Sequence, residues 1–292
     1  MPLLSLKDIT ILADGLDHPE CVAWCPDGHI YAGGEAGQIY RISMDGNITQ
    51  IASTGGFILG LCLDGHGNIY ACDLKHQAVM LIDRNAQATV YSNGSPERNM
   101  VLPNYAVFDR TGNLYVSDSG GWHENNGCIF LITPDGATRV VSTQASAFPN
   151  GMALSSEGAD LYVVLSNLPG VVKLPVEGDG ALGAPQSVVE LPGAVPDGLA
   201  FDAQDGLYIS CYTPDVIYRL SANGELAIVV EDKERTTIAA PTNVAFAGPD
   251  LTTLVAANFG VWHLTQSKMS VPGSSLRYPV LSPEPTILYG SL

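Results

Sequence analysis

Hydrophobic residues along the chain fall into short runs, separated by turns that are rich in glycine, aspartate and asparagine. Many runs contain β-branched and aromatic residues and alternate between apolar and polar positions, which is the period of a β-strand rather than of a helix. Turns such as Asp27-Gly28 and His66-Gly67 supply the positive φ angles that tight hairpins need. The pattern therefore predicts an all-β protein built from consecutive antiparallel hairpins.

One motif returns six times along the chain. Five copies open with a proline, one or two polar or small residues and an apolar run. They read PECVAW from Pro19, PNYAVF from Pro103, PNGMAL from Pro149, PDGLAF from Pro196 and PTNVAF from Pro241. A sixth copy, ILGLCL from Ile58, fills the gap after the first, and each copy continues with a second, a third and usually a fourth apolar run. Repeats of this size with four strands each predict a six-bladed β-propeller of four-stranded antiparallel blades.

The two ends of the chain provide a way to close such a ring. Residues Ile9–Leu12 form an apolar run before the first copy. In the last copy, the repeat pattern is no longer clear after His263. Pairing of the N-terminal strand with the last blade would remove an exposed sheet edge. Because no linker or shift in composition interrupts the chain, we expect residues 1–292 to form a single domain. A β-sandwich is the alternative, and six copies of one motif argue against it.

Charge and cysteine content narrow the functional class. The chain has 13 Lys and Arg against 30 Asp and Glu, a formal net charge of −17, which disfavours binding to nucleic acid or to an anionic membrane surface. Its N-terminus lacks the pattern of a secretory signal, and no apolar run is long enough to span a membrane. The six cysteines form no CxxC pair and mostly lie in apolar runs. We therefore expect buried reduced thiols, a cytoplasmic protein, and a monomer or small homo-oligomer.

The innermost strand of each propeller blade runs along the central channel, so the residues that open these strands meet at one rim. They are Glu20, Leu59, Asn104, Asn150, Asp197 and Thr242. Converging carboxylates repel one another and are costly to bury unless a cation neutralises them. Oxygen ligands without His or Cys favour Ca²⁺, Mg²⁺ or Mn²⁺, although carboxylates also bind Zn²⁺. The alternative is that Asn and Asp only shape turns after proline, but Glu is not a favoured turn residue.

Several of these segments together resemble one known family. They are Pro19-Glu20 with Trp24, Pro149-Asn150-Gly151, the PDGLA segment from Pro196, and SDSGGW from Ser117. The chain resembles the senescence-marker-protein/gluconolactonase family, also called regucalcin-like, from about Gly15 to Trp262. The resemblance implies a six-bladed propeller with one divalent metal ion, Ca²⁺ favoured, at the top of the channel. It also implies hydrolysis of lactones.

By this resemblance, the family's metal ligands correspond to Glu20, Asn150 and Asp197. A family residue that contacts substrate or water corresponds to Asn104. The sequence departs from the family's sugar lactonases at two nearby positions. Leu102 stands where they commonly have arginine, and Cys21 stands where they commonly have glycine. These departures make a less polar lactone or ester as acceptable a substrate as a sugar lactone.

Substrate contacts are expected from the loops that join the second and third strands of each blade, since these loops surround the same rim. The longest, DSGGWHENNG, carries Trp122 and His123. Tyr105 and Tyr212 are further candidates for substrate binding.

These observations predict a metal-dependent lactonase or esterase that acts on a small molecule. Asp197 is the first candidate for the general base, with Glu20 as its competitor. The sequence has neither a GxSxG nucleophile motif nor a P-loop. The alternative function is a non-catalytic calcium-binding or ligand-sensing propeller, which would keep the metal site without turnover.

Overall fold

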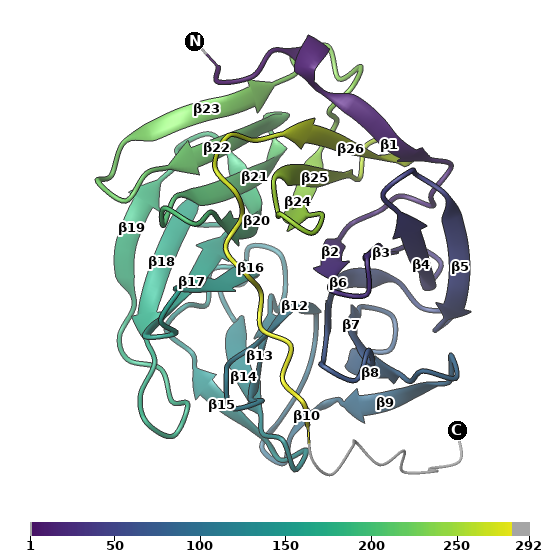
Figure 1. Ribbon diagram of the computed structural model, residues 1–292. Helices are drawn as coiled ribbons and strands as arrows, with labels where there is room; N and C mark the ends of the chain where they lie inside the picture. Colours follow the sequence, from purple (N-terminus) through teal and green to yellow (C-terminus); the bar gives the residue numbers. More distant parts are fainter. Residues whose placement is uncertain (1, 282–292) are drawn as a thin grey trace.

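Six four-stranded antiparallel sheets surround a central channel in the computed structural model, which describes residues 2–281 (Figure 1). The helical content of this part of the chain is one 3-10 turn, η1 (Leu6–Asp8). The predicted all-β six-bladed propeller is thereby confirmed. No helix among residues 2–281 has the length and apolar character needed to cross a membrane.

Each blade begins with its innermost strand and proceeds outward. Blade 1 contains β2 (Val22–Cys25), β3 (His29–Gly33), β4 (Gln38–Ser43) and β5 (Ile48–Ser53). Blade 2 contains β6 (Ile58–Leu63), β7 (Ile69–Asp73), β8 (Ala78–Ile82) and β9 (Ala88–Ser92). Blade 3 contains β12 (Pro103–Phe108), β13 (Leu114–Asp118), β14 (Cys128–Ile132) and β15 (Thr138–Ser142).

The remaining blades follow the same order. Blade 4 contains β16 (Pro149–Leu154), β17 (Asp160–Leu165), β18 (Gly170–Pro175) and β19 (Gln186–Glu190). Blade 5 contains β20 (Val195–Phe201), β21 (Leu207–Thr213), β22 (Val216–Leu220) and β23 (Leu226–Glu231). Blade 6 contains β24 (Pro241–Ala247), β25 (Thr253–Asn258), β26 (His263–Lys268) and the N-terminal β1 (Thr10–Asp14). A separate short hairpin, β10 (Gly94–Ser95) with β11 (Arg98–Asn99), lies between blades 2 and 3 in sequence.

The N-terminal strand is the outermost strand of the last blade. β1 pairs antiparallel with β26, with Thr10 opposite Gln266 and Asp14 opposite His263. Residues from both ends of the described chain thus hold one sheet, and the ring is closed by main-chain hydrogen bonds.

The hydrophobic core lies between the faces of adjacent blades. Trp24 and Ile30 of blade 1, for example, pack in one cluster with Val255 of blade 6. Tyr70 of blade 2 meets Phe108 of blade 3 edge to face, with ring centroids 5.0 Å apart. Burial of such a side chain stabilises the fold by about 1.5–3 kcal/mol, so each blade depends on its neighbours for stability. All six cysteines are free thiols and five are buried, as expected.

The inner strands share an irregularity at the end where they begin. In blades 2 to 6 the pairing register of the inner strand shifts there, for example between Pro103 and Tyr105 and between Pro196 and Leu199. Residues inside a bulge leave the ladder and have their side chains redirected. The residues in these shifts include five of the predicted opening positions, namely Leu59, Asn104, Asn150, Asp197 and Thr242.

The C-terminal segment crosses the opposite end of the channel. Residues 272–281, which we name the C-terminal strap, run across the middle of the ring, where Figure 1 draws them in yellow. The strap bonds to residues at the far ends of two inner strands: Ser274 N–H donates to the Phe201 carbonyl at 2.8 Å, and the Tyr278 hydroxyl to the Trp24 carbonyl at 2.6 Å. The sequence repeat gave no indication of this segment.

Candidate active site

Serine residues hold the strand openings of blades 3 to 5 in place. The Ser119 hydroxyl, just after β13, donates to the carbonyl of the proline that opens blade 4, at 2.7 Å. The Ser166 hydroxyl does the same for the opening proline of blade 5, also at 2.7 Å. Each serine oxygen also accepts a hydrogen bond from a predicted site residue, Asn104 at 3.1 Å and Asn150 at 3.3 Å. One hydroxyl thus fixes both the neighbouring blade and the orientation of an amide side chain.

The structure brings the three predicted metal ligands together. The Asn150 side chain donates a hydrogen bond to the Asp197 carboxyl group, and the charges of Asp197 and Glu20 interact directly. The Thr242 hydroxyl of blade 6 donates to the main-chain carbonyl of Glu20 at 2.9 Å, which fixes the entry to blade 1. The Glu20 Oε2 atom is buried and has no hydrogen-bond partner.

The electrostatics of this group are unfavourable as it stands. Burial raises the pKa of Glu20 above its ordinary value; a hydrogen bond from Thr242 opposes this shift, and the charge of Glu35 adds to it. Burial, and then the negative charge of Glu20, raise the pKa of Asp197 well above its usual range, while the hydrogen bond from Asn150 opposes this. Two partly buried carboxyl groups that disfavour each other's ionisation, beside amide oxygens, match the ligand set of a hard divalent cation. The residues present therefore fit the predicted metal ion.

One position further along the inner strands, Tyr105 and Asn243 meet inside the channel. The Asn243 amide donates a hydrogen bond to the Tyr105 hydroxyl. Glycines leave the room for both side chains, since a Cβ on Gly60 would lie 2.9 Å from the Tyr105 ring and one on Gly198 would lie 2.9 Å from the Asn243 amide nitrogen. The pair forms a floor one step along the channel from the carboxyl groups. Sequence reasoning missed Asn243, and the substrate role predicted for Tyr105 stays a prediction.

Aromatic side chains gather at the rim beside the carboxyl pair. The Phe259 ring of blade 6 lies 5.7 Å from that of His18, 6.3 Å from Phe57 and 6.3 Å from Tyr212, measured between centroids. Trp262 lies 5.6 Å from His18, and its indole N–H donates to His18 Nε2 at 2.9 Å. We name these five side chains the aromatic rim. Because Phe57 belongs to blade 2 and Tyr212 to blade 5, which face each other across the ring, the rim reaches across the channel mouth.

Comparison with known proteins identifies the family. Residues 18–258 match the family model described as the SMP-30/gluconolactonase/LRE-like region. The chain belongs to this SMP-30/gluconolactonase/LRE-like family. The resemblance inferred from the sequence motifs is confirmed.

The individual proteins and solved structures that this chain resembles have low sequence identity to it. Lactonase drp35 of Staphylococcus haemolyticus is 30% identical over 112 residues, which are 36% of this chain and 34% of that protein. The chain thus matches about a third of the length of that curated relative. A gluconolactonase from Xanthomonas campestris superposes with a TM-score of 0.77 at 18% identity, over 91% of this chain and 89% of the other. Regucalcin from Agrobacterium tumefaciens, described as a calcium-binding protein, gives 0.75 at 15% identity, over 93% and 96%. These structural likenesses show the shared fold.

Two predicted substrate contacts lie in a different part of this family member's surface. Trp122 and His123 have ring centroids 4.8 Å apart, and Trp122 meets Phe148 edge to face at 4.7 Å. Within the described chain their ring contacts are with each other and with Phe148, rather than with the aromatic rim. Trp122 is about half exposed, at 49%. The substrate role of both residues stays a prediction.

A second group able to hold a cation, which sequence reasoning missed, lies beside the aromatic rim. Its members are Asp17, His18 and Glu35, whose ligand atoms lie within 4.8 Å of one another. The His18 Nδ1 atom is 3.2 Å from Asp17 Oδ1 and 3.1 Å from Glu35 Oε2, while its Nε2 accepts from Trp262. Both ring nitrogens therefore already have protein partners. In this family member the group is satisfied internally, in contrast to the unpartnered Glu20 oxygen.

Proposed function

We propose that this protein is a divalent-metal-dependent hydrolase that opens lactones, with Glu20, Asn150 and Asp197 as its metal ligands. The buried, unpartnered Oε2 of Glu20 beside Asp197 is the observation that carries the proposal, because it is costly without a cation. Family membership and the lactonase and gluconolactonase names of the relatives support lactones as the substrate class. The calcium-binding description of regucalcin supports Ca²⁺, with Zn²⁺, Mn²⁺ and Mg²⁺ as the alternatives to be compared.

The residues of the site have distinct tasks in this reaction. When bound, a divalent cation polarises a carbonyl oxygen and makes water acidic enough to attack near neutral pH. Asp197 accepts the proton of the attacking water, and Glu20 is the competing candidate for this role. Asn104, whose amide N–H group is engaged by Ser119, presents its carbonyl oxygen to substrate or water. Asn150 donates to the Asp197 carboxyl group and so favours its ionised, basic form.

The surroundings of the site support a lactone or ester that carries an apolar substituent. Phe57, Tyr212 and Phe259 offer ring faces and edges at the channel mouth, and Leu59 occupies the opening position of blade 2. Aromatic rings bind flat apolar groups through burial and ring stacking. A sugar lactone would instead require several hydrogen-bonding side chains around its hydroxyl groups.

A panel of lactones and esters tests this proposal. The purified chain is assayed with gluconolactone, alkyl and phenyl γ-lactones and an aryl ester, after chelation and after addition of each of the four ions. We expect turnover that depends on the ion and favours the apolar lactones. The Glu225→Gln variant, which changes an exposed carboxylate remote in sequence from the site, serves as the control for surface charge. Stoichiometric metal binding without turnover on any compound would favour the non-catalytic calcium-binding or ligand-sensing propeller instead.

A further inference from the structure

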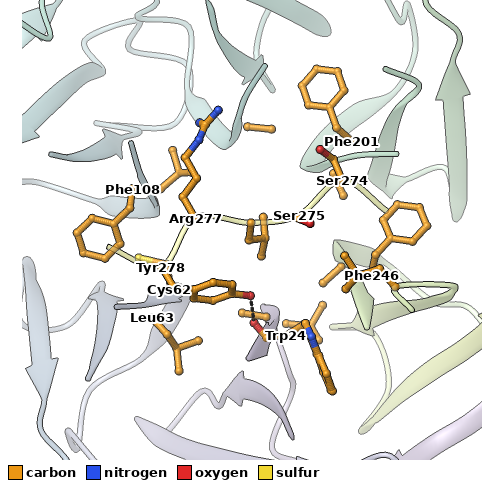
Figure 2. Close-up of a pocket in the computed structure, with 18 of the residues that line it drawn as sticks. Trp24, Cys62, Leu63, Phe108, Phe201, Phe246, Ser274, Ser275, Arg277 and Tyr278 are labelled. Carbon is orange, nitrogen blue, oxygen red and sulfur yellow. Dashed lines mark hydrogen bonds between the residues drawn. The ribbon is translucent and has the colours of Figure 1, made fainter. Parts of the chain in front are cut away.

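The channel contains a cavity that lies between Tyr105 of the Tyr105–Asn243 floor and the C-terminal strap. Its volume is about 680 Å³, and it is lined by the inner strands of all six blades and by strap residues Ser274 to Tyr278 (Figure 2). Tyr105 lines it, whereas none of the three proposed metal ligands does. The cavity is therefore distinct from the candidate active site.

The sequence repeat itself makes this part of the channel hollow. Three residues after each opening position, the chain has alanine in four blades and cysteine or valine in the others: Ala23, Cys62, Val107, Ala153, Ala200 and Ala245. The next residue is large and apolar in every blade: Trp24, Leu63, Phe108, Leu154, Phe201 and Phe246. Small side chains at one level leave space, and the ring of large ones at the next level gives the space apolar walls. All twelve of these residues line the cavity.

The strap partly covers this cavity at its outer end. The Tyr278 hydroxyl bonds to the Trp24 carbonyl, the contact that is dashed in Figure 2, and Ser274 is bonded to Phe201 on the opposite side. Arg277 lies between them, and its guanidinium donates to the carbonyls of Ser155 and Ser156 at 2.8 and 2.9 Å. A strap held at several points thus partly shields the apolar space from bulk water.

Arg277 reaches from the edge of the cavity into a neighbouring hollow, which Arg110, Asp109 and Glu157 also line. Arg110 donates to the same Ser156 carbonyl at 2.8 Å, so two guanidinium groups share one acceptor in a protein of net charge −17. Arg110 has an ion-pair partner, Glu157 at 3.7 Å, whereas Arg277 forms no ion pair within the described part of the chain. Burial, and then the positive charge of Arg110, lower the pKa of Arg277, while the nearby carboxylates of Asp109 and Glu157 oppose this. A carboxylate that approaches from the cavity would give Arg277 a direct ion-pair partner.

We propose that this cavity is a binding site for a linear aliphatic carboxylate, with its chain among the apolar residues and its head at Arg277. The cavity has the size of known small-molecule sites and combines apolar walls with few polar groups. Water molecules are poorly stabilised in such a space, because few hydrogen-bonding groups line it. An aliphatic chain covers the apolar walls, and an anionic head matches the only cationic side chain that lines the cavity within residues 2–281.

Fluorescence titration of the full chain with 11-(dansylamino)undecanoic acid tests the proposal. We expect saturable binding of one equivalent, displaced by decanoate at least tenfold more effectively than by decanol. Chelation of metal leaves the affinity unchanged, because the cavity shares no residue with the proposed metal ligands. Loss of probe binding on chelation would place the probe at the metal site and overturn the proposal, whatever the fate of the proposed lactonase activity.

Two substitutions locate the bound probe. Ala153→Phe fills the cavity and should weaken binding at least tenfold, and Arg277→Gln should weaken decanoate about tenfold while leaving decanol unchanged. Arg139→Gln, which alters a partly exposed arginine on the outer strand β15, is the matched control and should have no effect. Circular dichroism establishes that each variant is folded, and should Ala153→Phe fail to fold, Ala200→Leu replaces it. Undiminished binding in a folded cavity-filling variant, or equal affinity for decanol and decanoate, would overturn the proposal.

Discussion

Replacing Glu20 by glutamine should have opposite effects on the thermal stability of the metal-free and the metal-loaded protein. Without metal, the Glu20 carboxylate is buried, unpartnered at Oε2 and repelled by Asp197, so its neutral isostere should stabilise the fold. With metal, the same change removes a charged ligand and weakens binding of the ion. A residue that only shapes the turn after Pro19 would give the same effect in both states.

The size of the change follows from the cost of a buried charge. A buried polar group without a hydrogen-bond partner costs about 1–3 kcal/mol, and a charged group costs more. At about 2.1 cal/mol/K per residue, 292 residues have an unfolding entropy of about 0.6 kcal/mol/K, so a gain of about 2 kcal/mol raises Tm by about 3 °C. A hundredfold loss of metal affinity under saturating metal removes about 2.7 kcal/mol of linked stabilisation. This loss exceeds the gain of about 2 kcal/mol in the metal-free fold, so the metal-loaded variant should melt about 1 °C below the wild type.

The dependence on pH has a defined sign. Because the fold raises the pKa of Glu20, this group stabilises the metal-free protein most below its unfolded pKa of about 4.3. That stabilisation is lost as the pH rises through the folded pKa. The advantage of Glu20→Gln should therefore be present at alkaline pH and vanish near pH 4.

Calorimetric melts of wild type and variant, with chelator and with excess Ca²⁺, measure the effect at both pH values. Glu225→Gln is the matched control, because Glu225 is exposed, and should move Tm by less than about 1 °C in every condition. A Glu20→Gln variant that is destabilised equally with and without metal would refute the reasoning.

Four further outcomes are expected. Asp197→Asn at saturating metal should lower turnover by about 10²–10⁴ while metal still binds, and wild-type turnover there would shift the base to Glu20. Asn104→Ala should raise KM or lower kcat less severely at nearly unchanged metal affinity, as steady-state kinetics and metal titration will measure. Phe259→Ala should raise KM for phenyl lactones several-fold more than for gluconolactone, and an equal rise would contradict the role of the aromatic rim. Tyr278→Phe removes the 2.6 Å bond to Trp24 and should lower Tm by about 1–2 °C, measured by calorimetry.

The fold could be predicted from the sequence because one motif is repeated six times along the chain. The prolines that open five of the copies set the register of the repeat, and this register predicts that Glu20, Asn150 and Asp197 lie around one axis. The structure adds the reason that these side chains leave the ladder, a pairing shift at the start of the inner strand. Such a shift follows from the geometry of the whole ring and has no signature in a single repeat.

Features that depend on contacts between blades could not be predicted from the sequence. The meeting of Tyr105 and Asn243 joins blades 3 and 6, and only the space left by Gly60 and Gly198 allows it. The direction of the loop that carries Phe259 is likewise set by its neighbours, and no periodic pattern describes it. The strap lies beyond the last repeat, so the repeat could not place it.

The pairing of β1 with β26 has a consequence for how the molecule is assembled. Thr10 finds its partner near Gln266 only after almost the whole chain has been placed, so this contact has one of the largest sequence separations in the protein. Contacts of that kind are slow to form, because the entropy of closing a long loop must be overcome first. We expect blades 1 to 5 to order before the ring closes, with Glu20 and Thr242 joined in the same late event. The carboxyl pair needs Glu20 from the first blade beside Asp197 from the fifth, so it would form last. Binding of metal to this pair would then stabilise the closed ring.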